Sequence, residues 1–354
     1  MTYRIELTDV REARDHLVPI WTANLSVVGS PDAKLSWFYC DGPHGPGRAF
    51  LIHAEQEPAT PIGTAGVGVR VLRFGDRPLR AALFADLAVE RAYRSGLPAL
   101  ALVRAVKHHV NESFDLGYGF PNTKAVAVYR RCGYRQLGEL QRFARVLRVG
   151  PHLARRMPKV PLAPVLARGA GALADLALVA ATRVRARGAH RRFALVWLDA
   201  FDGRFDELWR ESRGLAPIAC ERTSAFLTWR FGRQPGHLYR IAALIERSTD
   251  RLCAYAVLRE AEQSVELSDL FGAGLLELDV LLRCLLPALH DTRADSVTFR
   301  FLGTPRLTGL LEHHGFARRP DTRVVMLSIG TRLGSDPAPI DPASWYLTDL
   351  DEDS

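Results

Sequence analysis

The segment from Ala82 to Tyr134 carries an ordered pattern of strands, a turn and helices that limits what the chain can fold into. It predicts a strand over residues 83–90, a turn over residues 93–96 and a helix over residues 98–111. A second strand, over residues 115–120, precedes a short helix. A strand that leads through a glycine-bearing turn into a helix places free backbone N–H groups at the positive end of the helix dipole. The segment therefore predicts a binding point for an anion such as pyrophosphate.

Side chains of the turn and of the last helix suit such a ligand. Arg94 could donate two N–H groups to a phosphate. Asn122 is a good N-cap for the last helix, and Ala125 and Tyr129 lie four residues apart on one of its faces. Each residue also has a structural interpretation, because asparagine caps any helix well and Tyr129 can be a half-buried packing residue. Together, behind a strand with its own turn, they favour a site.

The spacing N-x-x-A-x-x-x-Y-x-x-x-G-Y at residues 122–134 resembles the final strand-to-helix motif of the GCN5-related N-acetyltransferase (GNAT) superfamily. Residues 85–89 and 93–96 resemble its coenzyme A-binding strand and its pyrophosphate turn. Relative to the family's turn, Gly96 falls one place early. Either the loop is one residue shorter here, or coenzyme binding is weaker.

The resemblance implies a donor substrate and roles for particular residues. The donor would be acetyl-CoA or another acyl-CoA, with no metal ion. The residues implied for coenzyme binding are Val89, Tyr93, Arg94, Ser95, Gly96 and Asn122. The backbone of Val89 would polarise the thioester carbonyl, and Tyr129 would be the general acid toward the coenzyme A sulfur.

An amine that attacks a thioester must lose a proton, so the mechanism needs a base, acting directly or through water. Asp86 and Glu90 are the candidates, because both lie on the strand that would bind the coenzyme. Each also has a structural interpretation, Asp86 as a buried hydrogen-bonding residue and Glu90 as a loop charge.

The second half of the chain repeats the order of elements found in the first half. At an offset of 182 residues, the strands and the final helix of the two halves can be laid over each other. The polar groups are not repeated, since Tyr129 corresponds to Leu311 and Arg94 corresponds to Leu276. We therefore expect the site in the first copy. The second copy would be a support, or one wall of the acceptor cleft.

These patterns predict an α/β (α+β) protein with two GNAT-like domains, each a mixed, mostly antiparallel sheet flanked by helices. A length of 354 residues and a hydrophobic content of 47% allow two domains with a full core each. The predicted parts are the first copy at residues 1–150, a helical linker at 151–192, the degenerate second copy at 193–330 and a C-terminal extension with an acidic tail at 331–354. The tail could pack on the linker or lie in solvent.

The five cysteines are odd in number, widely spaced and without a C-x-x-C pair. They predict reduced thiols rather than disulfides or a zinc site. The N-terminus lacks the basic, apolar and small-residue succession of a signal peptide, so we expect a cytoplasmic protein. The sequence also lacks the H-E-x-x-H, G-x-S-x-G and P-loop motifs, which argues against zinc proteases, serine hydrolases and nucleoside triphosphatases.

Positive charge is concentrated in the predicted linker and the residues just before it. From Arg142 to Arg192, twelve Lys and Arg residues accompany one acid, Asp175, for a net charge of +11. Residues 162–180 carry one apolar face of a helix, too short and too interrupted to span a bilayer. The segment could be a packed linker, a surface helix drawn to anionic lipid, or a nucleic-acid arm. We favour the packed linker and expect no specific nucleic-acid partner.

The function expected from the resemblance is transfer of an acyl group from acyl-CoA to an amine, by direct attack on the thioester. The long loop at residues 41–47 and the second copy suggest an acceptor larger than a free amino acid, such as an amino sugar or a peptide. Two alternatives remain open. One is a Fem-type transferase that takes aminoacyl groups from tRNA, with the basic linker as its RNA arm. The other is a binding protein that has lost catalysis in both copies.

Overall fold

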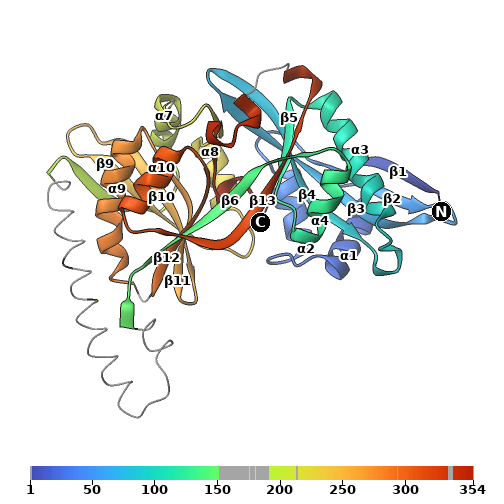
Figure 1. Cartoon of the computed structure of the whole chain (residues 1–354), viewed down its shortest axis with the longest axis horizontal. Helices are drawn as coiled ribbons and strands as arrows, with labels where there is room; N and C mark the ends of the chain where they lie inside the picture. The colour runs from blue at the N-terminus through green and yellow to red at the C-terminus, as the bar shows by residue number, and fades with distance from the viewer. Residues whose placement is uncertain are drawn as a thin grey trace, which may run out of the picture.

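The computed structural model describes residues 2–150, 175, 180, 191–212, 214–292, 294–333 and 338–353. The helix predicted for the linker therefore lies almost entirely outside the described residues. Within the described part, fourteen strands form one mixed, mostly antiparallel sheet with helices on its faces (Figure 1). The predicted fold class is confirmed, but the two copies share a single sheet.

The first copy supplies six strands and most of the helices on one side of Figure 1. Its strands are β1 (Tyr3–Asp9), β2 (Arg48–Ala54), β3 (Glu57–Phe74), β4 (Arg77–Val89), β5 (Leu116–Gly119) and β6 (Arg135–Val146). Its helices are α1 (Arg14–Asn24), α2 (Pro31–Lys34), the π-helical η1 (Leu35–Cys40), the 3-10 helix η2 (Arg91–Tyr93), α3 (Leu97–Ser113) and α4 (Thr123–Arg131).

The second copy and the C-terminal extension supply the rest. Their strands are β7 (Phe193–Leu198), β8 (Ile218–Cys220), β9 (Tyr239–Glu246), β10 (Arg251–Ala261), β11 (Ser264–Gly272), β12 (Ser296–Gly303), β13 (Ala317–Ile329) and β14 (Trp345–Leu347). Their longer helices are α7 (Gly203–Glu211), α9 (Leu275–Leu289) and α10 (Pro305–His313), and α8 (Ser224–Leu227) continues into the π-helical η4 (Thr228–Gly232). Short 3-10 turns are η5 (Thr331–Leu333), η6 (Ala338–Ile340), η7 (Pro342–Ser344) and η8 (Asp349–Asp351).

The two copies exchange their last strands. The sheet runs β1-β2-β3-β4-β5-β13-β6-β12-β11-β10-β9-β7, so β13 of the second copy lies between β5 and β6 of the first. Strand β13 pairs with β5 from Met326 opposite Gly119 to Ile329 opposite Leu116, and β6 in turn pairs with β12. In Figure 1 β6 and β13 run side by side between the two halves. Each copy therefore completes the sheet of the other.

Helices cover both faces of the first copy's sheet. One core cluster joins α3 to β3 and β4 through Val106, Val110, Val69 and Phe84. The cluster on the other face includes α1 and η1 and continues through the second copy. The α3 face and the α1 face are thus distinct environments: the second copy continues the core on the α1 side and adds β13 residues such as Met326 to the α3 side.

An aromatic pair joins the copies at the α1 face. The rings of Trp37 and Trp229 stack with centroids 5.1 Å apart, and each indole Nε1 donates to the other's backbone oxygen at 2.8 Å. Phe38 and Tyr39, which follow Trp37 in η1, are also buried. The aromatic run 37–39 is therefore part of the core.

The C-terminal extension packs between the copies. Strand β14 pairs with β12 and with β8, and Trp345, Tyr346 and Leu347 are fully buried. The next residues form η8, in which Asp351 closes a capping box with Thr348. Of the two alternatives for the tail, the solvated one is wrong, because the aromatic residues that precede the acids fix the tail inside the molecule.

Three general features bear on function. The five cysteines are free thiols, as the sequence predicts. The described helices include none with the length and apolar character needed to cross a membrane. Among the described residues, no three potential ligands from His, Cys, Asp and Glu gather as a metal site.

Candidate active site

Strands β4 and β5 pair only along their first part and then separate. Their parallel register runs from Ala81 opposite Leu116 to Phe84 opposite Gly119. Strand β5 ends there, whereas β4 continues to Val89. Next to this point the pairing of β4 with β3 shifts register, and Asp86 adopts a φ of +51°. We call the place where residues 85–89 leave β5 the first wedge.

The backbone of Val89 is directed into the first wedge. The next residue, Glu90, donates its N–H to the carbonyl of Ile62 on β3, at 2.8 Å. Because successive N–H groups of a strand point to opposite edges, the N–H and carbonyl of Val89 point away from β3. The Nε of Arg94 donates to that carbonyl at 2.9 Å. The Val89 N–H is thus placed where an incoming carbonyl oxygen could accept it.

The turn after β4 ends in a left-handed glycine. Gly96 has a φ of +89° and is the N-cap of α3, without a side-chain cap, and a Cβ added there would meet no atom within 4 Å. Leu97 already belongs to the helix and is exposed. Gly96 therefore ends the loop, and the helix begins at the next residue. The first turn of α3 offers N–H groups to an anion.

Side chains of this turn lie at the surface. Arg94 is exposed, and besides Val89 its Nη2 donates to Asn24 at 2.7 Å. Ser95 is exposed as well, and the hydroxyl of Tyr93 lies 3.3 Å from a carboxylate oxygen of Glu57. Arg94 is thus held at the mouth of the first wedge, next to the N-terminus of α3.

Asn122 and Tyr129 have different roles in α4: the first caps the helix, and the second packs toward the wedge. The Oδ1 of Asn122 accepts the N–H groups of Lys124 and Ala125 at 3.1 and 3.0 Å, so this side chain caps the helix. Tyr129 is 6% exposed, with its ring 5.9 Å from that of Phe84. Its hydroxyl makes no hydrogen bond within the described part of the chain.

The environment of Tyr129 keeps its hydroxyl protonated. Burial is the main cause, and it raises the pKa of Tyr129 above the ordinary value for tyrosine. Phe84, against which it packs, needs small partners on β5: a Cβ at Gly117 would lie 2.5 Å from the Phe84 ring. A protonated phenol without a partner, beside the separated strands, can donate a proton or a hydrogen bond.

Asp86 lies in a buried polar cluster that the sequence did not predict. Lys34 Nζ contacts Asp86 Oδ1 at 2.8 Å, and the hydroxyl of Tyr39 donates to Asp86 Oδ2 at 2.6 Å. Burial raises the pKa of Asp86. Thr64 donates to the carbonyl of Asp86 at 3.1 Å, which holds the bulge. Both carboxylate oxygens already have partners. The geometry therefore favours the structural role that the sequence offers for Asp86 over the role of a base.

Glu90 is half-buried at the mouth of the first wedge. Its Oε1 accepts a hydrogen bond from Asn24 Nδ2 at 3.1 Å. The amide of Asn24 therefore links Glu90 to Arg94. Of the two candidate bases, Glu90 is the one with a carboxylate oxygen that has no hydrogen-bond or ion-pair partner in the described residues.

Solved structures with this architecture fix the fold. An Enterococcus faecalis protein described as "Probable N-Acyltransferase" superposes with a TM-score of 0.62 at 12% identity, over 93% of this chain and 72% of that one. GCN5-related N-acetyltransferases from Kribbella flavida and Anabaena variabilis give TM-scores of 0.59 and 0.60 at 16% and 15% identity. Both alignments cover 92% of this chain, and 71% and 72% of those chains respectively. The chain has the GNAT fold.

Sequence comparison alone does not reach this result. No family model matches the sequence, and no curated protein matches it significantly. At identities of 12–16% the GNAT likeness rests on the arrangement of strands and helices rather than on shared residues.

The C-terminal extension brings a further carboxylate to the first wedge of this GNAT fold. Asp353 Oδ2 lies 2.9 Å from Lys34 Nζ, so Lys34 bridges Asp353 and Asp86. The side chain of Asp353 is 26% exposed, against 4% for Asp86. The sequence analysis did not predict that Lys34 or Asp353 lies here. The only signal in the sequence is that Lys34 is one of four lysines in an arginine-rich chain.

The corresponding place in the second copy is filled by the protein itself. Strands β11 and β12 pair from Ser264 opposite Ser296 to Leu267 opposite Phe299. Beyond that point β14 pairs with β12, with Tyr346 opposite Gly303. We call this place the second wedge.

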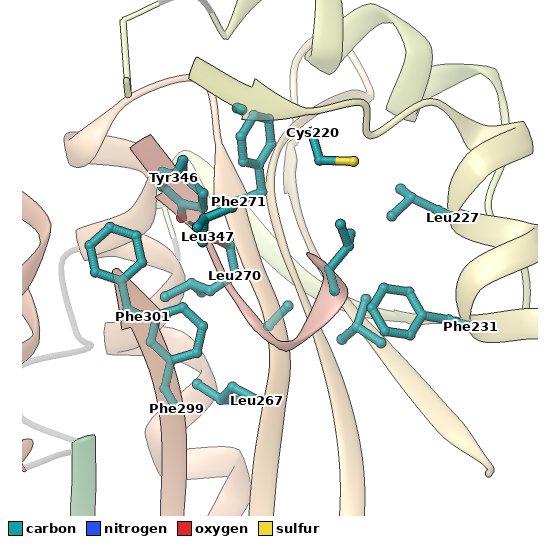
Figure 2. Close-up of a cluster of buried hydrophobic side chains, with 14 of the residues drawn as sticks. Cys220, Leu227, Phe231, Leu267, Leu270, Phe271, Phe299, Phe301, Tyr346 and Leu347 are labelled. Atoms are coloured by element: carbon teal, nitrogen blue, oxygen red, sulfur yellow. Dashed lines mark hydrogen bonds between the residues drawn. The ribbon is translucent and has the colours of Figure 1, made fainter. Parts of the chain in front are cut away.

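Aromatic side chains pack the second wedge tightly. The hydroxyl of Tyr346 donates to the carbonyl of Leu270 on β11, and its ring packs on those of Phe271 and Phe301, at centroid distances of 5.5 and 5.1 Å. Figure 2 shows Tyr346 beside these residues, within the buried cluster. The second wedge thus has no room for a ligand between its strands.

A cavity of about 340 Å³ lies where the two copies meet. From the first copy it is lined by Asp41 and Pro43, in the loop after η1. From the second copy it is lined by Ser224, Ala225, Thr228, Trp229 and Arg233. The loop at residues 41–47 and the second copy therefore enclose a space together.

Proposed function

We propose that the protein is an acyl-CoA-dependent N-acyltransferase, with acetyl-CoA as the first donor to test. The observation that carries the proposal is the contrast between the wedges. The first wedge combines an inward-facing N–H at Val89 with the unpartnered hydroxyl of Tyr129, whereas β14 fills the second. The names of two solved neighbours, GCN5-related N-acetyltransferases, support the reaction class.

The donor would lie along β4 in the first wedge. The N-terminus of α3 and the exposed guanidinium of Arg94 would hold the pyrophosphate, with Gly96 allowing close approach. The Val89 N–H would stabilise the negative charge that develops on the thioester oxygen. Tyr129 would then donate its proton to the departing thiolate, which it can do without breaking an existing hydrogen bond.

The acceptor amine would attack the thioester carbon and give up its proton to a base. Glu90 is our candidate, because both oxygens of Asp86 are engaged by Lys34 and Tyr39. We propose an amino sugar or a peptide amine as the acceptor. The support for an acceptor larger than a free amino acid is the loop at residues 41–47 together with the second copy; the cavity that they line contains none of the residues of the first wedge.

Thermal unfolding with and without saturating acetyl-CoA tests the donor site. A ligand at ~100 times its dissociation constant stabilises a protein by about 2.7 kcal/mol, which raises Tm by a few degrees. We expect the shift to shrink in Arg94→Ala and to persist in Arg91→Ala, an exposed arginine of the same turn. Release of free thiol with glucosamine or a lysine-containing tripeptide then tests transfer.

The absence of a shift with every acyl-CoA would overturn the proposal. Salt-sensitive tRNA binding, lost on neutralising the linker arginines, would then favour the Fem-type alternative. Absence of both kinds of binding would favour a protein without catalysis.

A further inference from the structure

The shared sheet ends in β1 on one side and in β7 on the other, and these two outer edges differ in chemistry. In the described part of the chain, β1 pairs only with β2, and β7 pairs only with β9. The outer edge of such a strand presents backbone N–H and carbonyl groups that can accept a further strand. Proteins commonly prevent this with charged side chains or proline on the edge strand.

Strand β1 carries protecting charges. The side chains of Arg4 and Glu6 are 61% and 50% exposed and form an ion pair at 3.7 Å. Asp9, at the end of the strand, lies 3.6 Å from Arg48. A strand that paired with β1 would have to remove water from these charges, which costs free energy. The β1 edge is therefore protected against pairing.

Strand β7 lacks protecting charges. Its sequence, Phe-Ala-Leu-Val-Trp-Leu at residues 193–198, contains neither a charged residue nor a proline. Val196 and Trp197 are also 38% and 37% exposed, which is unusual for large apolar side chains. An uncharged, apolar edge strand is the kind that pairs with another strand.

The pairing of β7 with β9 determines which backbone groups of β7 face outward. The carbonyl of Arg192, just before β7, accepts a hydrogen bond from the N–H of Arg247, the residue opposite it. Because hydrogen-bonded and non-bonded positions alternate in an antiparallel pair, the even-numbered residues of β7 bond to β9. The odd-numbered residues therefore direct their N–H and carbonyl groups to the open edge, and they are Phe193, Leu195 and Trp197.

We propose that the β7 edge pairs with the β7 edge of a second molecule of this chain, antiparallel and centred on Leu195. Leu195 is the middle one of the three residues with outward groups, so a two-fold axis there brings all three into register. Phe193 then lies opposite the partner's Trp197. Each of the three opposed pairs would exchange two hydrogen bonds, with an aromatic pair at either end. The proposal does not depend on acyl transfer.

The charges that flank β7 suit this register. Arg191 and Asp199 are exposed, and neither side chain forms an ion pair or a hydrogen bond with another described residue. Both lie four residues from Leu195, on opposite sides of it. Pairing about Leu195 therefore places Arg191 opposite the partner's Asp199 at both ends of the interface. This charge complementarity favours a second molecule of the same chain over an unrelated partner.

Sedimentation equilibrium of the full chain tests the proposal. We expect a concentration-dependent dimer whose Kd rises about tenfold in Arg191→Asp and in Asp199→Arg, because each change makes two attractive charge pairs repulsive. The variant with both substitutions should dimerise like the wild type, since its opposed charges attract again. Arg4→Asp is the matched control: it reverses an exposed charge on the β1 edge and should leave the Kd unchanged.

Hydrogen exchange resolved to single residues tests the register. The amides of Phe193, Leu195 and Trp197 should exchange slowly only at concentrations at which the dimer forms. The amides of Ala194 and Val196 should exchange slowly at every concentration, because they bond to β9 within one molecule.

Three results would overturn the proposal. One is a monomer at every concentration in which the odd-numbered amides of β7 exchange rapidly. Another is a monomer in which these amides are protected, because a different part of the same chain would then cover the edge. The third is a dimer that the single charge variants do not weaken, or that the double variant does not restore, because its interface would then lie elsewhere.

Discussion

The two copies place an aspartate at the same point of their sheets, Asp86 on β4 and Asp269 on β11, and surround it differently. Each aspartate lies beside a register shift and faces a cation, Lys34 or Arg222. Each cluster also receives an acid from the tail. In the second copy every member is fully buried, whereas in the first copy the tail acid Asp353 reaches solvent.

Under the proposed function, this difference separates a structural copy from a catalytic one. Strand β14 fills the second wedge with Tyr346, whose hydroxyl donates to Leu270, and Thr348 donates to Asp269. The first wedge keeps a hydroxyl and a carboxylate without full partners. Polar groups left incompletely satisfied reduce stability, and active sites are where such groups tend to occur.

The largest loss of stability should come from removing Arg222, the cation of the fully buried cluster in the second copy. Arg222→Met leaves the fully buried Asp269 and Asp351 without their charge partner, which should lower the free energy of unfolding by about 3–5 kcal/mol. Lys34→Met should cost less, because Asp353 can reach water and Asp86 keeps Tyr39. Denaturant unfolding measures the free energy of unfolding of both variants. Equal losses would contradict the contrast between the clusters.

An intermediate effect is expected at the hydroxyl of Tyr129. Tyr129→Phe should lower kcat by about 100-fold, the scale for loss of a general acid. Stability should hardly change, because the hydroxyl makes no hydrogen bond in the described residues. Tyr134→Phe is the matched control: its hydroxyl donates to Val103 at 3.1 Å, so it should lose about 1 kcal/mol of stability and little activity. If Tyr129→Phe lost stability and kept its activity, Tyr129 would be a packing residue only.

The smallest effect is expected at the glycines that precede α3 and α9, which are corresponding helices of the two copies. Gly96 has a φ of +89°, so Gly96→Ala should cost about 1–2 kcal/mol and weaken coenzyme A binding. Gly274, the N-cap of α9, has an extended φ of −165° that any residue adopts. Gly274→Ala should therefore cost less and leave coenzyme binding intact. Thermal unfolding with and without coenzyme A distinguishes the two.

The sequence predicts the individual strands and helices, but it does not predict which strands pair with one another. The residue patterns at 83–90 and 115–120 predict strands, and Asn122 predicts the start of α4, which the structure confirms. Such a strand pattern fits any neighbour of suitable polarity, so nothing in the sequence says that β6 pairs with β12. The exchange of strands is therefore visible only in the structure.

Only part of the candidate site could be predicted, because the sequence shows which residues are close along the chain and not which distant ones meet in the fold. Glu90, Arg94 and Gly96 come together because they are close in sequence and a turn joins them. Lys34 and Asp353 lie 319 residues apart and meet through the packing of β14 and η8. Sequence spacing carries no information about such contacts, and an acidic run at a chain end is usually read as solvated.

The exchange of strands ties the first copy to the order of synthesis. When β5 leaves the ribosome, the strand that will cover its edge, β13, has not yet been made. A nascent chain with an open strand edge is a target for chaperones and for aggregation until that partner arrives. A product that stops short of β13 would contain every residue of the first copy and still lack a finished wedge. Under the proposed function, acyl transfer would then require that translation had passed β13.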